Sequence, residues 1–279
     1  MQELKRIINY KRIILLLIVV TANIVFFLYG NKPVRDEDIL NKENVAHEAY
    51  IENYHEEVNS IIDNADKLKK YSIFNKAGSF SFANILQTAK DFDRVKNVVL
   101  PEDEYKGVQV FTAYYYQYCF TMLVMMFVIY DMFVQRDNGM WSITYSCSNG
   151  RTLYAVKQTG IITVAGISTH TLIYWSTFVT AMVQRGGFKD LRNPVQTIEA
   201  FAKFTYPWSK IKYVAVLYLM SMMCIVALCI IIWGVFVMFR NRVYALVTML
   251  IFAAVEQFIY SHIDIHSVWN GLHYINIIN

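Results

Sequence analysis

The chain has 279 residues, of which 56% are hydrophobic, and its formal net charge is +4 at pH 7. This modest charge gives no indication of nucleic-acid binding. The sequence also lacks a Gly-x-x-x-x-Gly-Lys-Ser/Thr phosphate loop and the Gly-x-Ser-x-Gly, His-Glu-x-x-His and Cys-x-x-Cys motifs of common catalytic sites. Apolar segments long enough to cross about 30 Å of hydrocarbon as helices recur along it instead. The composition therefore predicts an all-α integral membrane protein that is not an enzyme by itself.

Residues 1–29 are predicted to be a cytosolic start followed by the first transmembrane helix. Basic residues precede the apolar segment 13–29, as is usual on the cytosolic side of a span. A signal peptide has the same order of features, but 26–29 (Phe-Phe-Leu-Tyr) lacks the small residues of a cleavage site. We therefore expect an uncleaved span with a cytosolic N-terminus. The basic residues are Lys5, Arg6, Lys11 and Arg12.

Residues 30–109 are predicted to be an extracellular helical domain. An apolar stripe at spacings of three and four indicates an amphipathic helix over about 36–70, and a second stripe follows a break at 76–79. Two such helices joined by a turn form a hairpin, which would be either purely structural or a lid that gates substrate access. The stripes consist of Tyr54, Val58, Ile61, Ala65 and Leu68, and of Phe82, Ile85, Leu86, Ala89, Phe92 and Val95.

The rest of the chain, 110–279, is predicted to be a transmembrane domain that brings the number of spans to five. Asp131, at the inner end of the second span, is expected to pair with a nearby Arg or Lys. The polar connection 184–212 is placed outside, with 195–206 as a candidate interfacial helix. The four further spans are expected at about 110–134, 159–183, 213–239 and 243–260.

Hydroxyl and small residues are frequent in the span 159–183, which we therefore expect inside the helix bundle or along a transport pathway. His170 lies near its centre, where a hydrogen-bonded structural histidine is favoured over a functional one. Glu256 lies near the outer end of the last span, so an interfacial position and a functional role both remain open. No metal site is expected, because 262–266 supplies two histidines and one aspartate but no fourth ligand. The candidate pathway or bundle-interior residues are Thr163, Ser168, His170, Thr177 and Glu256.

The segment 135–158 between two apolar segments is polar and basic, with an amphipathic middle at 140–145. Its pattern resembles the loop after the second span of ABC-2-type ABC transporter permeases. There an acidic-basic-acidic-x-Gly stretch leads through a small-residue turn to an Arg and then to a Lys that opens the third span. A segment within 82–92 is similar to one in the outside domain of such permeases. The matching residues are Gln135-Arg136-Asp137-Asn138-Gly139, with Gln135 replacing the first acid, then Asn149-Gly150-Arg151 and Lys157, and in the outside domain Phe82-x-Asn84-Ile85-x-x-Thr88-x-x-Asp91-Phe92.

The resemblance implies a multi-pass subunit of the cell membrane whose loop 135–158 docks on an ABC ATP-binding subunit. It also implies a second permease copy or homologue as partner, and it places ATP and Mg on the partner subunit, with no cofactor in this chain. Permeases of this class usually have six spans and end inside, so a chain with five spans is expected to be a fragment or a natural variant. The residues assigned to the ATPase-coupling loop are Arg136, Asp137, Gly139, Met140, Trp141, Tyr145, Arg151 and Lys157.

We therefore expect a permease subunit that moves or extracts a peptide, lipid or drug-like substrate with ATP hydrolysed elsewhere. The main alternative is a non-transport membrane sensor or bacteriocin-immunity protein whose extracellular hairpin binds a ligand. A membrane-embedded enzyme is a third reading, without a visible catalytic constellation.

Overall fold

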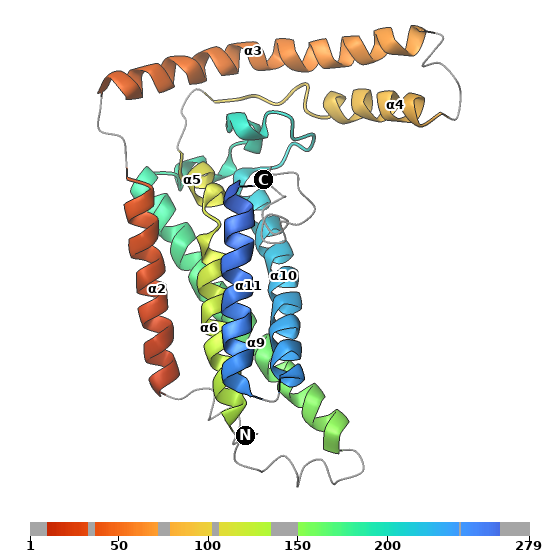
Figure 1. Ribbon diagram of the computed structural model, residues 1–279. Helices are drawn as coiled ribbons and strands as arrows, with labels where there is room; N and C mark the ends of the chain where they lie inside the picture. The colour runs from red at the N-terminus through yellow and green to blue at the C-terminus, as the bar shows by residue number, and fades with distance from the viewer. Residues whose placement is uncertain are drawn as a thin grey trace. The chain divides into compact units, whose positions relative to one another are not determined.

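The computed structural model describes residues 10–32, 37–71, 79–101, 106–134, 150–239 and 241–262. Their regular secondary structure is entirely helical, which confirms the predicted all-α class (Figure 1). The α-helices are α2 (Tyr10–Gly30), α3 (Glu37–Lys70), α4 (Phe80–Asp93), α5 (Gly107–Ala113), α6 (Tyr116–Met132), α9 (Gly150–Arg185), α10 (Lys210–Met238) and α11 (Arg242–His262). The 3-10 helices are η1 (Lys189–Arg192), η2 (Val195–Thr197) and η3 (Glu199–Phe201).

Two helices in the described part of the chain are long and apolar enough to cross a membrane: Arg12–Gly30 of α2, and α10. A third is reached if α5 and α6, which are bent by 49° at a short break, count as one span. The other two expected spans fall on α9 and α11. Hydroxyl residues and glycines dilute the apolar content of α9, and the apolar stretch described in α11, Arg242–Val255, is short. The chain is thus all-helical with two or three helices that could cross a membrane, and five spans are not confirmed.

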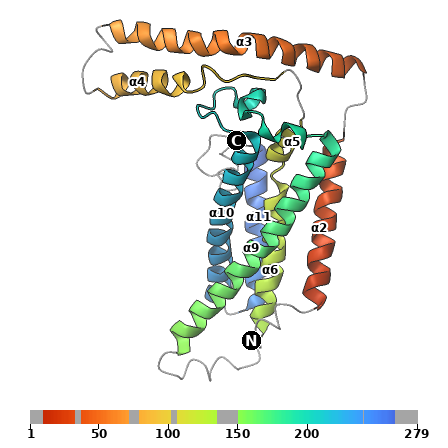
Figure 2. The ribbon, with the colours of Figure 1, turned by 180° about the vertical axis from the view of Figure 1, so that it is seen from behind.

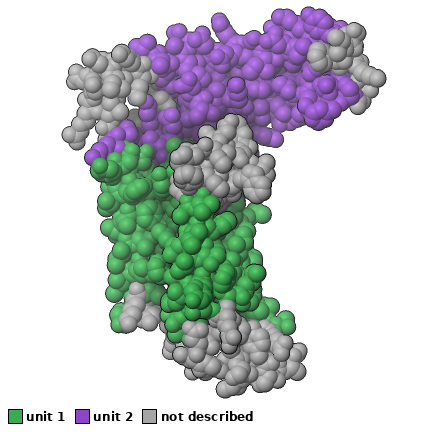
Figure 3. Space-filling view, viewed as in Figure 1, with its two compact units in different colours: residues 1–31, 111–180, 217–278 green, residues 32–110, 181–216, 279 purple. Residues whose placement is uncertain are grey.

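The helices belong to two compact units, each with its own core (Figure 3). Unit 1 comprises residues 1–31, 111–180 and 217–278. Unit 2 comprises residues 32–110 and 181–216, together with 279. The connection after α9 therefore groups with the segment that contains α3 and α4.

In unit 1, α2, α6, α10 and α11 run roughly side by side, and α9 crosses them obliquely (Figures 1 and 2). The core lies among α6, α9, α10 and α11. Gly166 of α9 is buried against Cys229 of α10, so the absence of a side chain at 166 permits a close approach of these helices. Unbranched methionines fill much of this core, as they adapt to irregular gaps. Core members are Met122, Met125, Met126, Ile129, Ile225, Ile232 and Phe236.

In unit 2, the two predicted amphipathic helices are present as α3 and α4, and they pack against each other. The Ser79 hydroxyl caps α4 by accepting from the Phe82 N–H at 3.2 Å. Both predicted stripes face inward for most of their length, but Leu68 and Leu86 remain 38% and 43% exposed. Leu68 lies at the end of the first stripe, whereas Leu86 lies within the second, between half-buried residues. One hydrophobic core cluster of the unit consists of Tyr54, Val58, Val95, Val98 and Leu100.

The connection after α9 forms consecutive 3-10 turns, so the expectation of an interfacial helix over 195–206 is wrong. Two interactions specify this path. Lys210 forms a fully buried ion pair with Asp190, whose carboxylate also accepts from the Asn193 side chain at 2.5 Å. The Gln196 side chain donates to the carbonyls of Phe204 and Tyr206, at 2.9 and 2.7 Å. In an α-helix these carbonyls would accept hydrogen bonds from backbone N–H groups. Here they accept from the Gln196 side chain, which stabilises the irregular path.

Tyr54 in the unit 2 core has a buried hydroxyl for which the described residues supply no hydrogen-bond partner. We expect Tyr54→Phe to stabilise unit 2 by about 1 kcal/mol, because it removes an unsatisfied polar group. Burial also raises the pKa of Tyr54 to about 12. The unfolded chain releases this proton near pH 10. Between about pH 10 and pH 12 the unfolded chain therefore binds fewer protons than the folded chain, so the stability of unit 2 falls as pH rises. Tyr54→Phe has no hydroxyl at this position to titrate, so the variant should lose less stability over this pH range than the wild type.

Amide hydrogen exchange of α3 in the full-length protein measures this effect. Tyr50→Phe is the matched control, because the Tyr50 hydroxyl donates to the Gln196 carbonyl at 2.6 Å. Its removal should destabilise unit 2 by about 1 kcal/mol. The same sign of change in both variants would contradict the account given for Tyr54.

Candidate functional site

His170 is fully buried within unit 1 and is bonded through both ring nitrogens. Its Nδ1 lies 3.3 Å from the Thr121 hydroxyl of α6, and its Nε2 lies 2.9 Å from the Ser221 hydroxyl of α10. The Tyr118 ring stacks on the imidazole with centroids 5.4 Å apart. An imidazole can bond through both ring nitrogens, and here a hydroxyl lies within hydrogen-bond distance of each. This arrangement favours the structural reading of His170, as a link from α9 to α6 and α10.

A second buried polar group joins α2 to the rest of unit 1. The Asn23 amide donates to the Thr177 hydroxyl at 2.7 Å, and the Tyr114 hydroxyl donates to the Asn23 side-chain oxygen at 2.9 Å. Thr177 in turn donates to the Ile173 carbonyl at 2.8 Å. Thr177 was a candidate from the sequence, whereas Asn23 was not. The sequence nevertheless contains an indication of the role of Asn23, because an amide side chain within a continuous apolar segment requires a hydrogen-bond partner.

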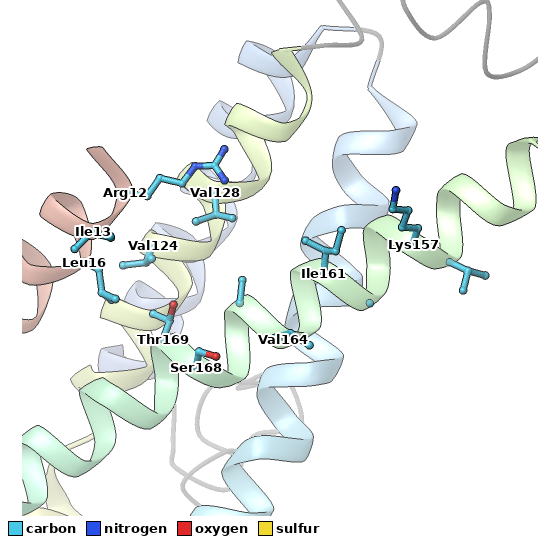
Figure 4. Close-up of a pocket in the computed structure, with 13 residues that line it drawn as sticks. Arg12, Ile13, Leu16, Val124, Val128, Lys157, Ile161, Val164, Ser168 and Thr169 are labelled. Atoms are coloured by element: carbon cyan, nitrogen blue, oxygen red, sulfur yellow. The ribbon is translucent and has the colours of Figure 1, made fainter. Parts of the chain in front are cut away.

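A pocket of about 520 Å³ lies between α2, α6 and α9 of unit 1 (Figure 4). Its wall is largely aliphatic, and its polar lining residues are Arg12, Lys157, Ser168 and Thr169. Figure 4 shows Arg12 of α2 and Lys157 of α9 on opposite sides of the upper part of the view, with Val128 and Ile161 between them and the other labelled lining residues lower down. Its volume falls within the range of roughly 300–1,000 Å³ of small-molecule sites, which are likewise mostly apolar with a few polar groups. The aliphatic lining includes Ile13, Leu16, Val124, Val128, Ile161 and Val164.

Arg12 is held at the pocket by Asp131 at the end of α6. Its Nε and one terminal nitrogen donate to the same carboxylate oxygen. The expectation that Asp131 pairs with a nearby Arg or Lys is therefore confirmed. The other terminal nitrogen of Arg12, Nη1, is buried and has no hydrogen-bond partner among the described residues. The Asp131 carboxylate thus orients the guanidinium of Arg12, and Nη1 can still donate a hydrogen bond to a second acceptor.

Apart from Thr163, the residues proposed from the sequence fall into three groups. Lys157 and Ser168 line the pocket, and His170 and Thr177 belong to the buried hydrogen-bonded groups. Thr163 is half-buried on α9 but does not line the pocket. The third group lies outside the described residues or has its side chain outside them. It consists of Arg136, Asp137, Gly139, Met140, Trp141 and Tyr145, and of the side chains of Arg151 in α9 and Glu256 in α11.

No family model, curated protein or solved structure matches this chain. Its class is therefore defined by its own features: an all-helical protein with two or three helices that could cross a membrane. The pocket between α2, α6 and α9 is the site with the clearest capacity to bind a small molecule.

Proposed function

We propose that this chain is the membrane-spanning permease subunit of an ABC transporter. It would move or extract a peptide, lipid or drug-like substrate, using ATP hydrolysed by a separate subunit. The observation that carries the proposal is the segment 135–158, whose residues resemble the coupling loop of ABC-2-type permeases. The last part of this segment forms the first turns of α9.

The arrangement of unit 1 supports a common side for the N-terminus and this loop. The start of α2 meets the end of α6 through Arg12 and Asp131, and the pocket brings the start of α9 to the same end. The start of α11 joins them, because Arg242 lies over the Tyr130 ring at 4.8 Å. A cytosolic N-terminus, as its basic residues predict, would place 135–149 and the basic turn before α11 in the cytosol as well.

The length of α9 supports contact with a soluble partner. Its 36 residues correspond to about 54 Å at the α-helical rise, whereas the hydrocarbon core is about 30 Å thick. Thr152, Leu153 and Lys157 in its first turns are exposed. A helix of this length with a polar start would carry the loop beyond the membrane surface, where an ATP-binding subunit can reach it.

In this proposal all five expected segments cross the cell membrane, with α9 and α11 as the third and fifth spans. The lower hydropathy of α9 is compatible with a span inside a bundle. Its His170, Thr171 and Thr177 side chains are hydrogen-bonded within unit 1 or to the helix backbone, so they need no water.

The test is a double variant, Trp141→Ala with Tyr145→Ala, co-expressed with the candidate ATP-binding subunit. A central aromatic anchor contributes about 2–4 kcal/mol to an interface. Co-purification and partner-stimulated ATP hydrolysis should therefore both be abolished, while membrane insertion is retained.

The matched control is Tyr10→Ala with Tyr244→Ala, two exposed aromatics at the starts of α2 and α11. This pair should leave complex and activity nearly unchanged. If the Trp141/Tyr145 variant leaves the complex and its ATPase activity as unchanged as the control pair does, segment 140–145 only anchors the chain at the membrane interface. A wild-type chain that retains no ATP-binding subunit would instead favour the sensor or immunity alternative.

A further inference from the structure

We infer that the pocket between α2, α6 and α9 is a binding site for one anionic glycerophospholipid, with one of its two acyl chains along the aliphatic wall and its phosphate between Arg12 and Lys157. The pocket has an aliphatic wall, two cationic lining residues and, on Arg12, a buried donor nitrogen without a partner among the described residues. Lipid binding there requires no ATP-binding subunit.

The lining of the pocket is divided as an amphiphile is. Two cationic residues, Arg12 and Lys157, contribute to the lining, and aliphatic side chains from three helices form most of the rest, with Ser168 and Thr169 as the other polar lining residues (Figure 4). No carboxylate is among the lining residues. An acyl chain gains free energy from contact with the aliphatic wall, in proportion to the apolar area it covers. The two cationic residues would select a head group with negative charge.

The position of the cations along the helices fits a lipid head group. Arg12 is the third residue of α2, and Lys157 lies two turns into α9. Both residues are therefore near the N-terminal ends of their helices. Basic residues near the ends of spans lie at the depth of the phosphates and favour anionic lipids there. A soluble anion would gain nothing from the aliphatic wall beneath.

The guanidinium of Arg12 has a donor nitrogen that could bind a phosphate. Asp131 accepts from its Nε and one terminal nitrogen, which fixes the plane of the guanidinium. The buried Nη1 has no partner among the described residues, although buried donors are nearly always satisfied. A phosphate oxygen at the mouth of the pocket would supply the missing acceptor in a charge-assisted hydrogen bond.

Gly160 allows the pocket to be blocked without disturbing the fold. A Cβ at this position meets no atom within 4 Å, and Gly160 lines the pocket. The matched control is Gly234 in α10, which has the same open space but lies outside the lining. Both substitutions by Leu introduce a better helix former, so they differ mainly in whether the new side chain occupies the pocket.

The experiment titrates the detergent-solubilised full-length protein with dioleoylphosphatidylglycerol or dioleoylphosphatidylcholine and counts bound lipids by native mass spectrometry. One phosphatidylglycerol should bind about tenfold more tightly than phosphatidylcholine, because both lipids offer the same phosphate oxygens but the choline cation is repelled by Arg12 and Lys157. Gly160→Leu should weaken both lipids about tenfold, and Gly234→Leu neither. Lys157→Gln should reduce only the preference for phosphatidylglycerol. Arg242 is a cation at the same end of unit 1 that does not line the pocket, so Arg242→Gln should leave the preference for phosphatidylglycerol unchanged.

Asp131→Asn gives a test of opposite sign, because it removes the negative charge beside Arg12 while keeping a side-chain oxygen that can accept from the guanidinium. The preference for phosphatidylglycerol should rise or be kept. Equal binding of the two lipids by the wild type would overturn the inference, as would equal effects of the two Gly→Leu variants. A fall in preference for Asp131→Asn that equals that of Lys157→Gln would also overturn it. Glycerol 3-phosphate should not displace the lipid, and full displacement would identify a soluble phosphate as the ligand instead.

Discussion

Replacing Lys210 with methionine should destabilise unit 2 by about 3–5 kcal/mol, because the change leaves a buried carboxylate without its counter-ion. Lys210 and Asp190 are 0% and 1% exposed. The Asn193 amide remains as the only described side-chain donor to Asp190, and it carries no charge. The backbone N–H of Lys210, which donates to the Asn193 carbonyl, is kept in the variant. Most of the loss should therefore come from the unpaired charge.

Amide hydrogen exchange and limited proteolysis of the segment 186–213 measure this loss in the full-length protein. Lys212→Met is the matched control, two residues along α10, where the ammonium lies over the Trp208 ring at 4.8 Å and is exposed. It should cost at most about 1 kcal/mol. Adding Asp190→Leu to Lys210→Met should restore much of the stability, since both partners of the pair are then apolar. Equal effects of the two lysine variants would refute the role assigned to the ion pair.

Gly166→Leu should have an effect of similar size on unit 1. A Cβ at 166 overlaps the Cys229 sulfur and lies 3.5 Å from side-chain atoms of Ile225 and Met125. A leucine must therefore push α9 and α10 apart along the core that they share. Overpacking of this kind costs about 1–3 kcal/mol and occasionally more, and we expect the upper end because the contact lies at a helix crossing.

Thermal denaturation of the detergent-solubilised protein, followed by circular dichroism, checks this expectation. Gly234→Leu is the control for the same chemical change at an open position, and it should be neutral or stabilising. Gly166→Ala combined with Cys229→Ala should recover most of the loss of Gly166→Ala alone, because the overlapping sulfur is removed. A Gly166→Leu protein as stable as Gly234→Leu would show that α9 and α10 do not meet as closely as described.

Periodic features of the sequence predicted the helices well. The stripes that contain Tyr54, Val58 and Val95 end in the core of unit 2, because a one-sided apolar pattern leaves only one face to bury. The partner of Asp131 was predicted by type, since a carboxylate at the end of a span needs a cation. Its identity as Arg12 was not, because 119 positions separate the two and no local pattern relates them.

The pocket and the irregular path of 189–210 could not be predicted for the same reason. The pocket exists only where α2, α6 and α9 converge, and each contributes aliphatic residues that are ordinary in a span. The pair of Asp190 and Lys210 closes across 20 residues, between a 3-10 turn and the start of α10. Hydrophobic periodicity reports the face of one element, whereas these features depend on where several elements meet.

The contacts of α2 determine its rotational register. Arg12 and Asn23 are 11 positions apart, which is about three turns at 3.6 residues per turn, so both lie on the same side of the helix. Turning α2 by one residue, about 100°, would withdraw both from their partners together. Phe27, which is buried against the Tyr114 ring, would be displaced by the same turn, whereas many other apolar side chains of the helix are exposed and would resist it only weakly. Two polar contacts and one buried aromatic ring thus act as alignment points for α2.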